Sequence, residues 1–589
     1  FYHKYKKGYG KMLKLKEYAE KNPDKLYFAG IILLSIVFLF VGLGSFPLMD
    51  VDETRYAIMA RDMLASGDWN DLMLNNVPFL EKPPLYFWLV ASSVKFFGSF
   101  NPFTVRFPIA LMSFALVLAT YFLGKKTINA KFGFFSSSIL LSSFFFILLS
   151  HIAILDNLIT VLIGLALYSG FYATICSEKN KKYFWIAFYL AIGVGVLAKG
   201  ILAVGIPCVV MFIYCAITKN LKEMFKPAHV FPGLILFFII AAPWHVVMHK
   251  NYGGFFWHEY FIRHHFARLI NSETIGRDRP LLFFVPVFLG CFMPWTLMFL
   301  QAATDGIISF INKLRNKTLF SADTIEQKLL MFTTISFLFI FILFSSSSTK
   351  LPTYILPAFP FAAILTGHFF LRADKKEKQG IIFKISAIIF VIAFITVIHY
   401  GTLLHPENSP SAFWTLKLLS LSSTPHISEE LYNTFLSTIN LSLVVAAIGL
   451  IISTKMIFFK KAKSSFIAYI VIMILLSWTA FFKVGNFIYQ TGEKDLVDFS
   501  KYCAQYPDSK LITFDIPVKP SIKMYYQDNV DFLLDYDTLK LEILLKQYKD
   551  NKVFIVVKEA TSVNLSSYYM FFRENFDLVS KGFKYTLYT

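Results

Sequence analysis

Long apolar runs recur along most of this 589-residue chain, and they constrain its fold more than any other feature. Each run is long enough, or nearly so, to cross roughly 30 Å of hydrocarbon as a helix. Hydrophobic residues make up 56% of the chain and phenylalanine alone contributes 67 residues, which exceeds the apolar share of typical soluble domains. We therefore predict a polytopic α-helical membrane protein with about thirteen spans. The spans are predicted at 26–46, 104–123, 132–150, 152–175, 183–198, 201–217, 230–248, 281–303, 328–344, 354–371, 381–400, 435–454 and 466–482.

Basic residues indicate how these spans are oriented. Lys and Arg cluster in alternate connections, whereas the connections between them are acidic, mixed or short. Because cytoplasmic connections carry an excess of Lys and Arg, we predict a cytoplasmic amino terminus and a carboxyl-terminal segment outside. The net charge of +19 is then a topology signal, so no nucleic-acid partner is expected. The five cysteines show no spacing typical of a disulfide framework or a zinc site. The basic connections are 4–16, 125–126, 179–182, 219–226, 313–317, 372–378 and 455–463.

The composition divides the chain into two domains. Residues 1–484 carry the apolar runs and form the predicted transmembrane domain, whereas residues 485–589 are mixed in character. In this second part, 510–515 and 552–558 are typical of buried strands and 537–548 of an amphipathic helix. We predict a small α/β domain on the outer face. In the first outer loop, 47–103, we predict two interfacial helices at Thr54–Leu64 and Leu85–Phe97, the second starting after Pro83-Pro84.

Charged residues gather at the ends of spans on the predicted outer side. Glu53 and its neighbour Asp52 follow the first span, and Glu81-Lys82 comes later in the same loop. A charge beside hydrocarbon is costly unless it is solvated, paired or used in function. Lys199 and Lys350 stand out because they oppose the positive-inside trend, although each could simply extend to the interface. We interpret the group as a site for a charged headgroup on an apolar tail. Its other members are Arg55, Asp156, Arg263, His264, His265, Arg268 and Tyr354.

Four segments of the chain have distinctive sequences: Asp52-Glu-Thr-Arg-Tyr56, Ala65-Ser-Gly-Asp-Trp69, Glu81-Lys-Pro-Pro-Leu-Tyr-Phe-Trp88 and Lys350-Leu-Pro-Thr-Tyr-Ile-Leu-Pro357. Together they resemble the ArnT-type lipid A aminoarabinose transferases. These are GT-C glycosyltransferases, in the wider group that includes the protein O-mannosyltransferases. The resemblance runs from about 26 to 371, and beyond it only the architecture is similar. It implies the GT-C fold, a polyprenyl-phosphate sugar donor, lipid A as the acceptor and a periplasmic site on the bacterial inner membrane.

The resemblance also implies roles for individual residues. No nucleotide cofactor is expected, because nucleotide sugars are absent outside the cytoplasmic membrane and the sugar must arrive on a lipid. Cations around the phosphate would stabilise the negative charge that grows there as the sugar leaves. Spacing alone yields no metal site, so the expected divalent metal rests on the resemblance. Asp52 and Asp156 are the expected catalytic carboxylates; Arg55, Lys82, Lys199, Arg268, Lys350 and Tyr354 are expected around the phosphate; Glu81 and His265 are expected at the metal.

The sequence leaves the sugar and the acceptor open. Phe79 stands where the family often has Tyr, and His264 precedes His265 where the family often has Glu, so donor-sugar recognition could differ. A protein O-glycosyltransferase, which transfers to a Ser or Thr hydroxyl, is the alternative within enzymes. A lipid transporter or flippase is the alternative outside them, but it predicts charges at the bilayer midplane and helices broken in related halves. We see neither pattern.

Overall fold

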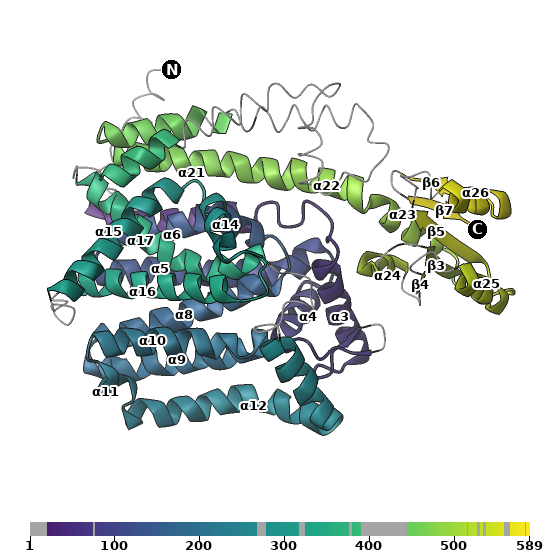
Figure 1. The fold of residues 1–589 in the computed structure, drawn as a ribbon, viewed down its shortest axis with the longest axis horizontal. Helices are drawn as coiled ribbons and strands as arrows, with labels where there is room; N and C mark the ends of the chain where they lie inside the picture. The colour runs from purple at the N-terminus through teal and green to yellow at the C-terminus, as the bar shows by residue number, and fades with distance from the viewer. Residues whose placement is uncertain are drawn as a thin grey trace, which may run out of the picture.

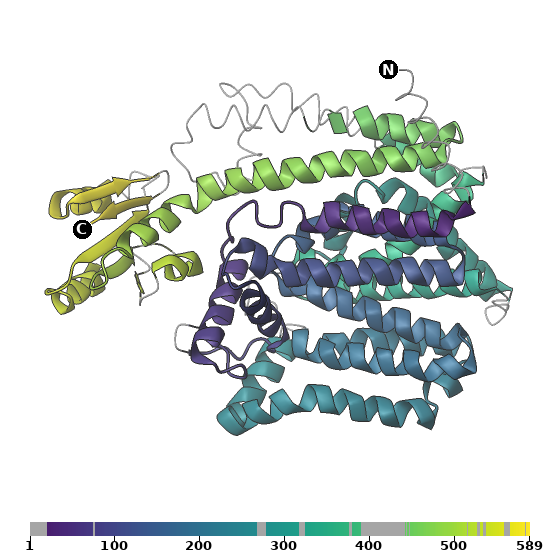
Figure 2. The same ribbon diagram turned by 180° about the vertical axis from the view of Figure 1, so that it is seen from behind.

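The computed structural model describes residues 21–589 except 75–76, 268–278, 317–323, 376–379, 390–441, 443–444, 447, 515, 517, 527–529, 534–537, 559–565 and 583–584. The described residues form a bundle of roughly parallel helices with a small α/β domain at one end (Figure 1). We call this end of the bundle the domain end. The first loop lies there too, and the view from behind shows the same arrangement (Figure 2).

Eight helical segments of the described chain are long and apolar enough to cross a membrane, or nine if α6 and α7, bent by 65°, count as one span. They confirm a polytopic α-helical membrane protein. The predicted spans at 201–217 and 281–303 correspond to the shorter helix α10 and to a broken segment, η3–α14–α15. Those at 381–400 and 435–454 are described only in part, at 381–389, 442, 445–446 and 448–454.

The bundle is built from α2 (Pro23–Ser35), η1 (Ile36–Phe40), α5 (Pro102–Thr127), α6 (Ala130–Ser142), α7 (Phe144–Ser150), α8 (Leu155–Ile175), α9 (Glu178–Lys199), α10 (Leu202–Ile217), α11 (Leu221–Met224), α12 (Pro227–Trp257), η2 (His258–Ala267), η3 (Leu281–Phe283), α14 (Phe284–Cys291), α15 (Thr296–Arg315), α16 (Ile325–Ser346), η4 (Pro352–Ala358), α17 (Phe359–Asp374), α21 (Ala462–Thr479), η5 (Ala480–Val484) and α22 (Gly485–Gly492).

Both predicted helices of the first loop are present, as α3 (Asp52–Ser66) and α4 (Leu85–Phe97). Two acidic residues occupy the first turn of α3, where the helix dipole favours negative charge. Gly67 and Gly98, with φ of 74° and 66°, end the two helices in the left-handed conformation that glycine adopts without strain. Between the helices, β1 (Met73–Leu74) pairs with β2 (Val77–Pro78). The loop is therefore a folded layer at the domain end.

The carboxyl-terminal domain confirms the predicted α/β character. Its five-stranded sheet has the order β4-β3-β5-β7-β6, parallel between β4, β3 and β5 and antiparallel between β5, β7 and β6. Helices α21, η5 and α22 run on without a break from the bundle toward this domain (Figures 1 and 2). The domain contains α23 (Lys494–Cys503), β3 (Lys510–Phe514), α24 (Pro520–Tyr526), β4 (Val530–Leu533), α25 (Thr538–Gln547), β5 (Val553–Lys558), α26 (Ser566–Asn575), β6 (Leu578–Lys581) and β7 (Tyr585–Tyr588).

Basic residues lie at the end of the bundle opposite the domain. There Lys125 Nζ lies 3.1 Å from Asp24 Oδ2, next to the start of α2, and Lys131 pairs with Asp374 at the end of α17. The first loop lies at the other end (Figure 1). This separation agrees with the alternation in the sequence, and the side of the membrane that each end faces stays a prediction.

Thiol labelling tests that orientation. Lys549 and Lys222 are both exposed, one in the carboxyl-terminal domain and one in α11 at the opposite end. A membrane-impermeant thiol reagent should label Lys549→Cys in intact spheroplasts but Lys222→Cys only after lysis. The parent protein is the control, because none of its five cysteines is exposed. The reverse pattern would contradict the predicted orientation.

Candidate active site

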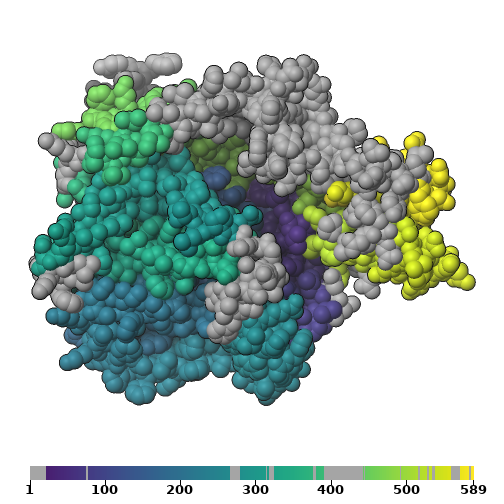
Figure 3. All heavy atoms as spheres, in the orientation of Figure 1, coloured from purple at the N-terminus to yellow at the C-terminus, as the bar shows by residue number. Residues whose placement is uncertain are grey.

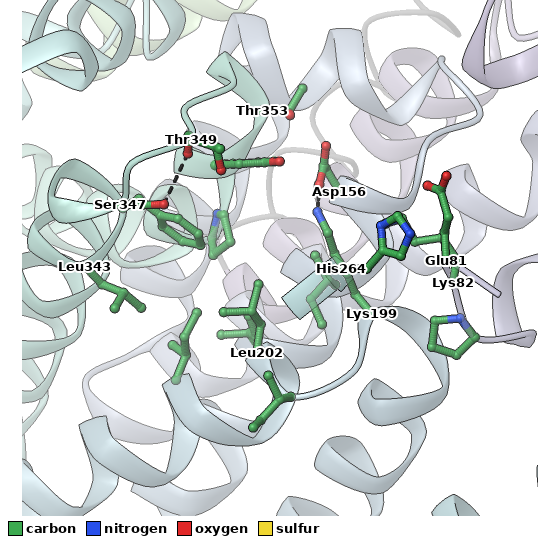
Figure 4. Close-up of a pocket in the computed structure, with 18 residues that line it drawn as sticks. Glu81, Lys82, Asp156, Lys199, Leu202, His264, Leu343, Ser347, Thr349 and Thr353 are labelled. Atoms are coloured by element: carbon green, nitrogen blue, oxygen red, sulfur yellow. Dashed lines mark hydrogen bonds and ion pairs between the residues drawn. The ribbon is translucent and has the colours of Figure 1, made fainter. Parts of the chain in front are cut away.

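A pocket opens at the domain end between the first loop, α8, α9, α10, α16 and η4 (Figure 4). It holds about 960 Å³ of empty space, including the part open to solvent. Charged side chains and aliphatic side chains occupy different sides of it (Figure 4). An anionic headgroup with a hydrocarbon tail would match this division, since polar groups fix a ligand's orientation and apolar walls bury its bulk. The charged side has Glu81, Lys82, Asp156, Lys199 and His264, and the aliphatic side includes Leu202 and Leu343.

Asp156 and Lys199 form an ion pair inside this pocket. Their side chains are 16% and 18% exposed, so the pair is in contact with the pocket space but largely screened from bulk water. Lys199 Nζ also lies 4.9 Å from the centroid of the Tyr354 ring, within cation–π range. Gly200, with φ of 71°, turns the chain directly after Lys199 and leaves this lysine at the carboxyl end of α9. The structure thus brings together three predicted site residues.

Asp52 and Arg55 lie on α3, beside the residues that line the pocket. Arg55 Nη2 donates to Asp52 Oδ1 at 2.5 Å, and their side chains are 24% and 54% exposed. The Arg55 guanidinium lies 5.2 Å and 5.8 Å from the ring centroids of Tyr56 and Phe79. Its Nε is buried and has no hydrogen-bond partner within the described part of the chain. A buried donor without a partner is costly, and it would be satisfied by an anion.

The charges on α3 are electrostatically coupled to the pocket. Burial lowers the pKa of Arg55, but Tyr56, Asp52 and Glu81 together raise it above its ordinary value. Burial also raises the pKa of Tyr56, and the negative charges of Asp52 and Asp156 add to that effect. Tyr56 therefore lies within electrostatic range of both expected catalytic carboxylates.

Three predicted site residues are placed differently or not described. Lys350 is buried, and its Nζ donates to the carbonyl oxygens of Ser347 at 2.6 Å and Arg279 at 3.0 Å. It is not among the residues that line the pocket, so it anchors the backbone beside η4. Arg268 and the side chain of His265 lie outside the described residues. His264, which the sequence placed in the charged group without a specific role, lines the pocket with Glu81.

The described residues do not supply a complete set of protein ligands for a metal. No group of three or more His, Cys, Asp or Glu side chains with suitable geometry occurs among them. Glu81 and His264 face the same pocket (Figure 4), but two side chains fall short of a closed site. The divalent metal stays a prediction from the resemblance, and no chemical step below depends on it.

Known proteins share both sequence and fold with this chain. A family model described as dolichyl-phosphate-mannose-protein mannosyltransferase matches residues 81–246. The undecaprenyl phosphate-α-4-amino-4-deoxy-L-arabinose arabinosyl transferase 1 of Proteus mirabilis is 30% identical over 369 residues, which is 62% of each chain. The alignment therefore spans less than two thirds of that relative. The crystal structure of ArnT from Cupriavidus metallidurans bound to undecaprenyl phosphate superposes with a TM-score of 0.73 at 20% identity, covering 95% of this chain and 97% of ArnT. The chain has the ArnT fold.

The resemblance seen in the four sequence segments is thereby confirmed. An oligosaccharyltransferase of Archaeoglobus fulgidus, solved with a tethered acceptor peptide, also superposes, with a TM-score of 0.53 at 10% identity over 92% of this chain and 70% of that one. The fold by itself therefore does not identify the acceptor, since widespread folds carry different functions.

A buried ion pair, which the sequence did not reveal, fixes the first loop in this ArnT fold. Arg106 of α5 is fully buried, and its Nε and Nη2 each donate at 2.8 Å to an oxygen of Glu53. The remaining Arg106 donors bind the carbonyl oxygens of residues 43, 46 and 47. Glu53 also accepts from the backbone N–H groups of Met49 at 3.0 Å and Ala153 at 2.7 Å. One ion pair therefore ties α3 to α5 and to the turn that precedes Asp156.

Removing one charge of this pair should destabilise the protein strongly. Glu53→Gln leaves the Arg106 charge buried without a counter-ion, which typically costs about 3–5 kcal/mol. Thermal unfolding in detergent should show a clear fall in Tm. Asp24→Asn is the matched control, because Asp24 and its partner Lys125 are 57% and 34% exposed and such pairs contribute about 0–1 kcal/mol. Equal Tm values for the two variants would contradict a stabilising role of the buried pair.

Proposed function

We propose that this chain is a glycosyltransferase that moves a sugar from a polyprenyl phosphate to an acceptor on the periplasmic face of the bacterial inner membrane. The observation that carries the proposal is the pocket, in which Lys82 and Lys199 lie on one side and aliphatic side chains on the other. Such a pocket suits a phosphate on a prenyl chain. The relatives named as undecaprenyl-phosphate-dependent transferases, and the ArnT fold, support the same reading.

In this proposal the cations act on the leaving phosphate. The bond between the sugar C1 and the phosphate oxygen breaks, and its electron pair stays on the phosphate. Lys82 and Lys199 would stabilise that growing charge, and the unpartnered Nε of Arg55 could donate to a phosphate oxygen. Asp156 orients Lys199 through their ion pair. Arg55 fits this role because a guanidinium can bind two phosphate oxygens at once.

The acceptor side of the reaction is assigned to Asp52. An acceptor oxygen forms the new bond to C1 from the face opposite the leaving phosphate, so the sugar configuration inverts. If the acceptor is a hydroxyl, Asp52 takes its proton as general base. If it is a phosphate of lipid A, the nucleophile is already ionised, and Asp52 instead orients it or stabilises positive charge on the sugar.

Lipid A is the proposed acceptor, and a protein hydroxyl is the alternative. Mass spectrometry of lipid A and of periplasmic proteins, from cells with and without this chain, separates the two. We expect a sugar-sized mass on lipid A that disappears when the chain is deleted, and the mass itself would identify the sugar class. A mass lost only from proteins would replace lipid A by a protein acceptor, and no mass difference in either fraction would count against the transferase.

A transporter of anionic lipids fits the structure less well. Its charged groups should line a path across the bilayer midplane. The charged side of this pocket instead lies at the domain end, next to α3 and α4. A site at one end of the bundle suits chemistry at the membrane surface.

Lys82 should contribute through its charge. Lys82→Ala should weaken binding of polyprenyl phosphate and lower the transfer rate, because the loss of one such contact is worth about 2–4 kcal/mol in the transition state. Lys82→Arg should keep part of the activity. Lys95→Ala, which removes an exposed lysine of α4, is the control and should behave like the parent. Unchanged binding and turnover in Lys82→Ala would remove this lysine from the phosphate site.

Asp52 should be required for transfer but not for folding. Asp52→Asn keeps the size of the side chain and removes its charge, so we expect loss of transfer with normal membrane insertion and an unchanged Tm. Asp68→Asn is the control in the same loop, because Asn can accept the same turn hydrogen bonds from the N–H groups of Asn70 and Asp71. A well-expressed Asp52→Asn protein with nearly full activity would exclude the assigned role.

A further inference from the structure

The carboxyl-terminal domain packs directly against the helix that carries Asp52. Met524 of α24 is buried in the same apolar cluster as Tyr56, Ala57 and Met63 of α3. The Arg61 Nη1 of α3 donates to the Met524 carbonyl oxygen at 3.1 Å. Figure 3 shows the purple first loop beside the yellow-green carboxyl-terminal domain on one face of the molecule. The domain and the first loop therefore share a packed contact.

At the centre of this contact is Asp50, two residues before Asp52. The Asp50 side chain is fully buried. One of its oxygens accepts from the backbone N–H of Ser521 at 2.9 Å, and the other accepts from the Ser521 hydroxyl. Lys519 Nζ lies 3.9 Å from the second oxygen, and the Thr54 hydroxyl of α3 donates to the first. The carboxyl-terminal domain thus provides two hydrogen bonds and a nearby positive charge, which offset the cost of burying the Asp50 side chain.

The backbone of Asp50 is held from a second direction. Its N–H donates to Glu493 Oε1 at 2.9 Å, and Glu493 lies between α22 and α23, where the chain enters the carboxyl-terminal domain. The other Glu493 oxygen is buried and has no hydrogen-bond partner among the residues that the structure describes. Burial, together with the nearby charge of Asp50, raises the pKa of Glu493 to about 7. A protonated Glu493 can therefore sit beside the Asp50 carboxylate at neutral pH without full charge repulsion.

We propose that the carboxyl-terminal domain positions the catalytic loop through the contact between Ser521 and Asp50. Ser521 and Asp50 are positioning residues: they fix the start of α3 and thereby the place of Asp52. The inference rests on the proposed function for its effect on catalysis. The contact itself can be measured without any transfer assay. Lys82 and Lys199, the cations that line the pocket, lie outside this contact, so the domain should affect turnover more than donor binding.

Ser521→Ala tests this proposal, because it removes the hydroxyl while the backbone N–H of residue 521 remains. Ser580→Ala is the matched control, since Ser580 is exposed on β6 of the same domain. In the full-length protein, Ser521→Ala should lower kcat by about tenfold, as expected for losing one hydrogen bond to a charged group. The KM for the donor should stay within about twofold of the parent value. Hydrogen exchange of the amides of residues 50–56 should become faster in Ser521→Ala and not in Ser580→Ala.

Each outcome decides the question. Faster exchange at 50–56 together with lower kcat, while β3 and β5 stay protected, supports the proposal. Unchanged exchange overturns it, and so does faster exchange with unchanged kcat. If β3 and β5 also lose protection, the domain has unfolded, and Asp50→Asn gives the same comparison from the other side of the contact without altering the interior of the domain. A parent protein without transfer activity would count against the proposed function, while the exchange data would still show whether Ser521 orders α3.

Discussion

The buried ion pair between Glu53 and Arg106 is the interaction on which the arrangement of the site most depends. A fully buried charge is stable only when its hydrogen-bonding groups are satisfied and its charge is balanced. Here the guanidinium binds one carboxylate and three backbone carbonyl groups, and the carboxylate binds two further backbone N–H groups. This network joins the loop after η1, the start of α3, α5 and the turn before α8. Because Asp52 directly precedes Glu53, and Asp156 follows the turn at Ala153, the same network places both carboxylates.

Sequence patterns gave the elements more readily than the contacts between them. Helix α4 could be predicted because Pro83-Pro84 marks its start, and buried strands such as β5 because short apolar runs are bounded by charges. The spans at 201–217 and 281–303 were harder, since apolar character does not reveal where a helix is short or broken. Hydrophobic periodicity and turn residues are local features, so a single sequence reveals helices and strands but not the contacts between distant segments.

Only part of the site could be predicted, because some of its residues carry a local signal and others are defined by contacts with distant residues. The lysine at the end of α9 could be recognised because it opposes the charge trend, and the structure places it in the pocket with Asp156. The partner of Glu53 lies 53 residues away and the partner of Asp50 lies 471 residues away, so no spacing links either pair. An arginine near the end of an apolar span was the one available signal for Arg106. Lys350 carried the same kind of signal, yet its ammonium binds backbone carbonyls beside the pocket.

Burial and hydrogen bonding separate the charged groups at the domain end into two kinds. Arg106, Glu53 and Asp50 are almost fully buried and have several partners each, so they have little capacity left for a ligand. Lys199 and Arg55 are partly exposed, and Arg55 retains a buried donor without a partner among the described groups. The first kind can hold a loop rigidly, and the second can exchange its contacts for those of a substrate. A transfer reaction on a lipid carrier needs both kinds of group. The partly exposed cations stabilise the charge on the leaving phosphate, and the buried groups hold the attacking group at a fixed place beside it.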